Sequence, residues 1–226
     1  NVSYRVTKRN GEVLEIESPM QLPDWTSIAK IEEPFLSVSI FSPVTMMDAI
    51  MDLAKSKRGI YQESTYVSDR MKVVFDIPLS EVIVDFNDQV KSATRCYGSI
   101  DYELKGFFHT DITKLDILIN DKVCDAFSCL VHKERSYEKG LALVSKLKEL
   151  IPQQLFEVKI QASASGRIIS SAKVRSVGKN VTAKCYGGDI SRKRKLWEKQ
   201  KEGKKRLKQI GQVEIPQEAF LAVLRI

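Results

Sequence analysis

The sequence predicts an α+β chain in which a sandwich of strands and helices precedes a smaller sheet-and-helix domain. Apolar residues alternate in several short runs, as strands require, and recur elsewhere at helical spacing. Between residues 34 and 110 these patterns follow the order βαββαβ, and another set of strands and one helix comes after them. The first order describes a ferredoxin-like sandwich.

The first 33 residues predict two short strands and a connector. Asn10-Gly11 lies between the strands, and this dipeptide favours a hairpin turn because both positions tolerate positive φ. Pro19 and Pro23 follow, so the connector is unsuited to a central strand.

The βαββαβ module begins with alternating apolar residues at 36, 38 and 40. Ser42-Pro43 then favours a helix start, and a turn at 57–59 ends that helix. Residues 60–67 and 71–77 predict two further strands. A closing strand is predicted from the alternation of Ile100, Tyr102 and Leu104. The apolar residues at helical spacing are Met47, Ile50, Met51 and Ala54 in the first helix and the inward-facing Ile83, Phe86, Val90 and Ala93 in the second.

The second domain is expected from a boundary near Asp111 onward. Strands are predicted around residues 115–119 and 126–131, and a helix runs from about Ser136 until Pro152 stops it. Two more strands follow, joined by a turn at Ser163-Ala164-Ser165-Gly166.

Net charge concentrates in one segment. The chain has 36 basic and 29 acidic residues, a formal charge of +7, and the stretch 189–208 alone holds ten basic against three acidic residues. Everything outside that stretch therefore balances to neutral. Such a segment attracts polyphosphate, so RNA is the expected partner, and a plain solvated basic helix is the alternative.

The residues just before these cations also favour RNA as the partner. Tyr186 is suited to stacking on an unpaired base, and Gly187-Gly188 allows close approach of the backbone. The string from Lys184 through Ser191, continued at 198–206 and 215–221, closely resembles the C-terminal signature of the LepA family, also called elongation factor 4. That family consists of ribosomal back-translocating GTPases.

The βαββαβ module also resembles the fifth domain of elongation factor G. The matching strings include Lys57-Arg58-Gly59, Pro78-Leu79-Ser80-Glu81 and Tyr97-Gly98-Ser99. The resemblance implies three parts: residues 1–33 as the tail of a preceding domain and linker, 34–110 as the ferredoxin-like domain, and 111–226 as a LepA-specific domain. Without partner strands, the tail would be the least stable part.

The resemblance implies a ribosome- and tRNA-binding C-terminal part of a translational GTPase that remodels tRNA positions. GTP and Mg²⁺ would belong to the N-terminal part of the parent protein, because this chain has no G-x-x-x-x-G-K-[ST] loop and is expected to hold no cofactor. We expect a monomer that binds large-subunit RNA and tRNA, not DNA. Its location would be cytoplasmic, on ribosomes, with peripheral association at the cytoplasmic face of the inner membrane as a further expectation.

The candidate RNA contacts are basic side chains and one tyrosine, acting on phosphates with little base specificity. Lys57-Arg58 joins them as a basic pair on an expected exposed turn, for which a merely solvated turn is the alternative. The full set is Lys184, Tyr186, Arg192, Lys193, Arg194, Lys195, Lys204, Lys205, Arg206, Lys57 and Arg58.

The structure of the basic segment itself is harder to predict. Its apolar residues are scattered and Gly203 is expected to interrupt a helix, so we expect ordering by partner contacts. Two roles are open for the side chain of Trp197: packing on its own domain or stacking on a base. Packing is favoured.

No catalytic or metal site is predicted. The four cysteines lack C-x-x-C spacing and only His109 and His132 accompany them, so a zinc site is not supported. Two other functions stay open. One is a stand-alone RNA-binding module, and the other is a surface for proteins or anionic lipid, although bulky apolar residues are too few for a membrane helix.

Overall fold

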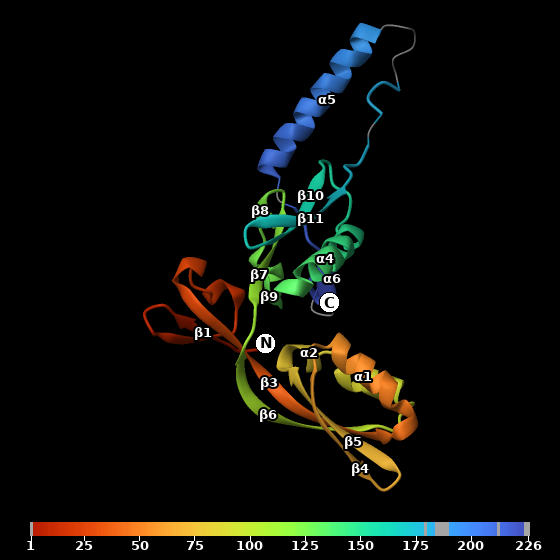
Figure 1. The fold of residues 1–226 in the computed structure, drawn as a ribbon. Helices are drawn as coiled ribbons and strands as arrows, with labels where there is room; N and C mark the ends of the chain where they lie inside the picture. The colour runs from red at the N-terminus through yellow and green to blue at the C-terminus, as the bar shows by residue number, and fades with distance from the viewer. Residues whose placement is uncertain (1, 179, 184–189, 212, 224–226) are drawn as a thin grey trace. The chain divides into compact units, whose positions relative to one another are not determined.

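The computed structural model describes residues 2–178, 180–183, 190–211 and 213–223, and it confirms the α+β class (Figure 1). The chain divides into two compact units, Asn1–Asp111 and Ile112–Ile226. Each unit contains one antiparallel sheet with helices packed against it.

Unit 1 is built on a sheet with the strand order β2-β1-β3-β5-β4, and β6 pairs with the other edge of β3. Strand β4 coincides with the predicted range. The bounds are β1 (Tyr4–Lys8), β2 (Val13–Ile16), β3 (Ile28–Pro43), β4 (Ile60–Val67), β5 (Arg70–Pro78) and β6 (Ser99–His109); short 3-10 turns lie at Pro19–Gln21, Trp25–Ser27 and Val44–Met46.

Strand β3 is longer than the sequence predicts. It begins at Ile28, and its first part pairs with β1, where Val6 lies opposite Ile31 and both are buried. Its second part pairs with β5 from Phe35 to Pro43. The expectation that the N-terminal hairpin lacks a partner strand is therefore wrong, since charged residues between Ile28 and Phe35 hid the strand.

Three helices cover one face of this sheet: α1 (Met47–Ser56), α2 (Leu79–Val82) and α3 (Phe86–Ala93). Ile50 and Val90 are fully buried against the strands, which confirms the βαββαβ order and the helical spacing. Ile83 does not face inward as expected. It is 56% exposed because the helix breaks between Val82 and Phe86.

The closing strand β6 alternates as predicted but is only partly covered. Tyr102 and Leu104 lie opposite Val38 and Leu36, so they point to the helix-covered side of the sheet. They are nevertheless 61% and 66% exposed. The short helices do not reach this edge strand.

Unit 2 has the strand order β11-β10-β7-β8, with β9 paired to β7, and α4 packs on the sheet. Asn120 and Asp121 both have positive φ and form the tight turn between β7 and β8. The predicted strand over 126–131 begins only at Cys129, because a 3-10 turn at Asp125–Phe127 places Phe127 in the core. The bounds are β7 (Ile112–Ile119), β8 (Lys122–Val123), β9 (Cys129–His132), β10 (Val158–Ala164), β11 (Arg167–Val174), α4 (Ser136–Leu150), α5 (Ile190–Ile210) and α6 (Gln217–Val223); a 3-10 turn also lies at Lys133–Arg135.

The basic segment forms one continuous helix, α5, so the expected interruption at Gly203 is wrong. An exposed glycine lowers helix stability by only about 1 kcal/mol, which the lysine-, arginine- and glutamine-rich flanks tolerate. The helix stops at Gly211, where an added Cβ would lie 2.6 Å from Phe156 Cε1 and 2.7 Å from the Leu207 carbonyl oxygen. Close contact with the core therefore fixes the end of α5.

Replacing Gly203 with alanine should stabilise α5. Nothing lies within 4 Å of a Cβ built at this position, so the substitution gains the helix propensity of alanine without a clash. Amide hydrogen exchange in α5 should slow by about fivefold, equivalent to about 1 kcal/mol. Gly211→Ala is the matched control and should destabilise the end of the helix. Unchanged exchange in Gly203→Ala would contradict a helix limited by its glycine.

Candidate nucleic-acid interface

One face of α5 packs against the segment that precedes the helix. Lys193, Leu196, Gln200 and Lys204 are half-buried at helical spacing, while the remaining described side chains of α5 are mostly exposed. Lys204 donates from Nζ to Ser176 Oγ at 2.7 Å and to the Val177 carbonyl oxygen at 3.4 Å. Of the candidate RNA contacts, Lys204 is therefore engaged in holding the helix.

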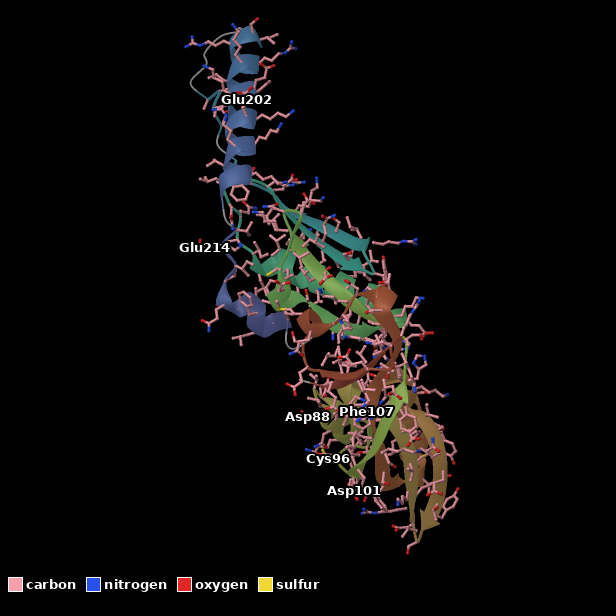
Figure 2. The ribbon with its side chains drawn as sticks, turned by 90° about the vertical axis from the view of Figure 1, so that its left-hand side faces the viewer. Asp88, Cys96, Asp101, Phe107, Glu202 and Glu214 are labelled. Carbon is pink, nitrogen blue, oxygen red and sulfur yellow. The ribbon has the colours of Figure 1, made fainter. Side chains whose placement is uncertain are left out.

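The other faces of α5 carry the exposed cations. Within the described ranges, no carboxylate oxygen lies within 4 Å of the nitrogens of Arg194, Lys195, Lys205 or Arg206. Figure 2 shows side chains standing out from the helix around Glu202. At 1.5 Å rise per residue, the cations from Arg192 to Arg206 extend over about 20 Å. This length suits an extended phosphate backbone better than a single small anion.

Lys199 and Lys201 belong to the same exposed surface, although sequence reasoning did not select them as contacts. The signal was present in the charge count. It was missed because the segment was not treated as one helix, on which Lys199 lies near Lys195 and Arg192 at spacings of four and seven residues.

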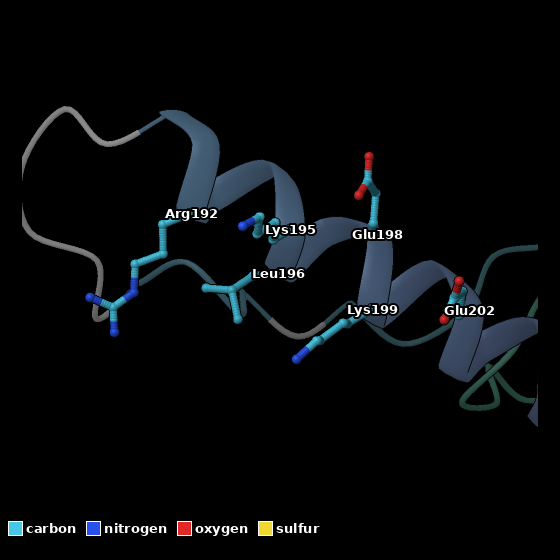
Figure 3. A pocket seen from close by; sticks show the side chains of 6 residues that line it. All are labelled: Arg192, Lys195, Leu196, Glu198, Lys199 and Glu202. Atoms are coloured by element: carbon cyan, nitrogen blue, oxygen red, sulfur yellow. The ribbon is translucent and has the colours of Figure 1, made fainter.

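A shallow depression follows one side of α5 (Figure 3). Arg192 and Lys199 extend to one side of the helix and Glu198 to the other. The depression is open to solvent. Its lining residues are Arg192, Lys195, Leu196, Glu198, Lys199 and Glu202.

Trp197 does not pack on its own domain as favoured from the sequence. It is 54% exposed, because the half-buried face of α5 is formed by Leu196 and Gln200 instead. Lys184 and Tyr186 lie outside the described residues, so their proposed contacts stay predictions.

The chain after α5 returns to the core of unit 2. Ala219 of α6 is fully buried, and the ring of Phe220 stacks on Phe127 with 4.8 Å between centroids. Near the end of α5, the charge of Lys208 helps to lower the pKa of Asp121, after the larger effect of the hydrogen bond from Lys159. Contacts at its C-terminal end therefore position α5.

Lys57 and Arg58 do not form the exposed basic turn that was expected. Arg58 binds Glu33 through two nitrogens, with Nη1–Oε1 at 2.6 Å and Nη2–Oε2 at 3.2 Å, and its Nε donates to Glu81 at 3.1 Å. Lys57 pairs with Asp85 at 3.2 Å. Both side chains are 16% exposed, so their RNA contacts stay predictions of lower rank than those of α5.

Burial by itself would lower the pKa of Arg58, but the hydrogen bonds and charges of Glu33 and Glu81 outweigh it and raise the pKa. The guanidinium therefore stays charged at every working pH. Its φ of 56° is a left-handed value that a non-glycine residue adopts at a cost. The ion pairs with Glu33 and Glu81 compensate for this cost.

Among the described residues no metal centre is indicated, and the thiols of Cys124 and Cys129 are not activated. In the described part of the chain, no three metal-binding side chains gather, and no helix is long and apolar enough to cross a membrane. Burial raises the pKa of both Cys124 and Cys129, which keeps these thiols protonated and weakly nucleophilic.

Comparison with known proteins places most of the chain within two family models. Residues 119–225 match the model described as GTP-binding protein LepA C-terminus, and residues 30–118 match elongation factor G C-terminus. The chain is similar over its full length to proteins named elongation factor 4: 51% identical in Halalkalibacterium halodurans, 49% in Shouchella clausii and 49% in Acetivibrio thermocellus. It spans only 37% to 38% of the length of these relatives.

A solved structure from Thermus thermophilus overlaps with 36% of this chain and 12% of its own chain. The identity is 16% and the TM-score is 0.34, which is too low to support a structural argument.

Removing the Arg58 guanidinium should destabilise unit 1 strongly. Glu33 is fully buried, so Arg58→Ala leaves an uncompensated charge and should lower the free energy of unfolding by roughly 3–5 kcal/mol. Urea denaturation followed by circular dichroism measures this loss. Lys57→Ala is the control and should change it by less than about 1 kcal/mol. The double variant Glu33→Leu/Arg58→Met should recover much of the loss, and a loss below about 1 kcal/mol in Arg58→Ala would contradict the analysis.

The titration of Asp121 should report on the placement of α5. Its folded-state pKa lies below the ordinary value, so its interactions stabilise the fold above the unfolded-state pKa and are lost as the pH falls through the folded value. Lys159→Met should raise the pKa of Asp121 most, and Lys208→Met should raise it less. NMR titration of the Asp121 carboxyl carbon measures both shifts, with Lys122→Met as the control. No shift in Lys208→Met would argue against this position of the helix end.

Proposed function

The chain belongs to the LepA family, whose curated members carry the name elongation factor 4, and we propose that it binds ribosomal RNA and tRNA as the C-terminal part of a translational GTPase. The observation that carries this proposal is the array of exposed cations on α5. The family membership supplies the ribosomal context for that array.

The contacts proposed for α5 are ionic and directed at phosphates. Arg194 and Lys195 lie almost three turns or more from Lys205 and Arg206, so the two pairs can engage separate phosphates. Each cation that neutralises a phosphate releases counterions, which makes binding steeply dependent on salt. Such contacts position the RNA without reading its bases.

The remaining candidates have different roles in this proposal. Lys193 and Lys204 lie on the half-buried face of α5 and act mainly by adding positive potential. Lys184 and Tyr186 would extend the surface ahead of the helix. Lys57 and Arg58 would be secondary contacts, since both are bound to carboxylates of unit 1.

In the parent protein, a preceding GTPase domain would hold GTP and Mg²⁺ and drive the factor on and off the ribosome. The three-part division at residues 33 and 110, a monomeric state and a cytoplasmic, ribosome-associated location belong to the same proposal. Remodelling of tRNA positions, including back-translocation, fidelity control or recovery from stress, is its proposed outcome. Association with the inner membrane has no observation in its favour among the described residues.

A stand-alone RNA-binding module is the second candidate. The same cations favour it, because phosphate contacts do not by themselves distinguish a ribosome from any other RNA. The two functions differ in whether intact ribosomes bind more tightly than free tRNA.

Removing four exposed cations should weaken ribosome binding and flatten its salt dependence. In the variant Arg194→Ala/Lys195→Ala/Lys205→Ala/Arg206→Ala, the slope of log K against log salt should fall by about 3, since each phosphate contact contributes roughly 0.7–0.9. Co-sedimentation with intact bacterial ribosomes and with free tRNA across a salt series measures it. The control removes the same charge from exposed lysines elsewhere in unit 2, Lys133, Lys146, Lys148 and Lys173.

The outcomes separate the candidates. Saturable ribosome binding that the α5 variant loses and the control variant keeps supports the ribosomal function. Equal affinity for ribosomes and free tRNA favours the stand-alone module. Unchanged ribosome binding in the α5 variant would remove α5 from the mechanism and make Lys57 and Arg58 the next residues to test.

A further inference from the structure

Trp197 is a large aromatic residue left in solvent on a mostly polar helix. More than half of its surface is exposed, although tryptophan is highly buried on average. Neighbouring Leu196 occupies the half-buried face, so the helix does have an apolar contact surface, and Trp197 lies beside it. The ring is thus available to a partner.

The residues around this ring on the helix surface are cationic. At spacings of three and four, the neighbours of Trp197 are Lys193, Arg194, Gln200 and Lys201. Three of the four are positively charged and none is acidic. An exposed aromatic surrounded by cations matches the way proteins hold single-stranded nucleic acid, in which cations bind the backbone and an aromatic ring stacks on a base.

We propose that Trp197 stacks on an unpaired base of the RNA that α5 binds, and that it gives this helix a preference for unpaired nucleotides over duplex. This inference rests on the proposed function and adds a residue with a different role. Arg194 and Lys201, one turn to either side, would hold the flanking phosphates. Bases inside a duplex are already stacked on one another, so they offer no free face to the ring.

A protein partner is the main competing occupant of an exposed ring. Charge argues for RNA, because a partner protein would also have to neutralise Lys193, Arg194 and Lys201. Every base presents a π-face whatever its identity, so stacking requires no sequence specificity. The ring therefore complements phosphate contacts that do not read sequence.

The test uses the full chain with Trp25→Phe, which leaves Trp197 as the single tryptophan. Two labelled RNA hairpins of equal length and charge, closed by the same compact four-nucleotide loop, serve as probes: one is paired throughout its stem, and the other contains a run of unpaired adenines in the stem. Fluorescence anisotropy of the labelled RNA measures binding, and quenching of tryptophan emission measures stacking. Trp197→Leu keeps an apolar helix former without a π-face, and Trp197→Phe keeps a smaller ring.

Stacking predicts quenching by the adenine-containing hairpin but little by the paired one. Trp197→Leu should weaken binding of the unpaired probe by roughly 5- to 150-fold, the effect expected for one base–aromatic stack, and should change duplex binding by less than about twofold. Trp197→Phe should retain most of the affinity.

Two results would overturn the stacking while leaving the cationic interface intact: RNA binding without quenching, or equal affinities in Trp197→Leu and its parent for the unpaired probe. Quenching by RNA-free ribosomal proteins, but not by either hairpin, would assign the ring to a protein contact and also reject it. Failure of the Trp25→Phe protein to bind either RNA would reject the stacking, and failure of the same protein to bind intact ribosomes would also reject the proposed function.

Discussion

Unit 1 depends on the neutralisation of one buried carboxylate. Glu33 lies in β3, fully buried, and a charge in that environment is tolerated only when it is paired and hydrogen-bonded. Arg58 binds Glu33 through Nη1 and Nη2 and binds Glu81 through Nε. Its guanidinium therefore connects β3, which holds Glu33, with α2, which holds Glu81, at the end of α1. The turn at 57–59 follows from this requirement: Arg58 takes a left-handed φ, and Gly59 must lack a side chain because its Cβ would lie 2.8 Å from the Ala54 carbonyl oxygen.

In unit 2 the charges of the candidate interface are exposed to solvent, in contrast to the buried ion pair of unit 1. The α5 helix buries no described side chain and gains little from packing along its length, so its position is fixed by a few contacts. Lys204 of α5 donates hydrogen bonds to Ser176 and Val177, and the backbone at Gly211, just after the helix, lies close to the ring of Phe156. This arrangement leaves most of the helix surface free for a ligand. The same cations that would be costly inside a core are inexpensive here, because water solvates them until phosphate replaces it.

The sequence predicted the parts of the fold in which local pattern and tertiary structure agree. Strict apolar alternation identified β5, and Gly59 and Pro152 marked the ends of α1 and α4. The helix start expected at Ser42-Pro43 was wrong, because β3 continues to Pro43 and α1 begins at Met47. Local pattern failed where long-range contacts decide. Ile83 has the right spacing but falls in a break, and the charged residues before Phe35 concealed half of β3. For the interface, residue type was readable from the charge run, whereas exposure was not: Arg58 looked like a surface cation because its partners are distant in sequence.

The length of β3 gives unit 1 a mechanical property. At about 3.3 Å per residue, this single strand is a rod of roughly 50 Å. The first part of β3 pairs with β1 and its second part pairs with β5. Strand β6 pairs with the opposite edge of β3 from Glu32 to Phe41. A pull applied at the N-terminal hairpin along the strand would load the hydrogen bonds to β5 and β6 together in shear, so they could not open one at a time. Force reaching this hairpin would therefore pass into the sandwich through the backbone of β3.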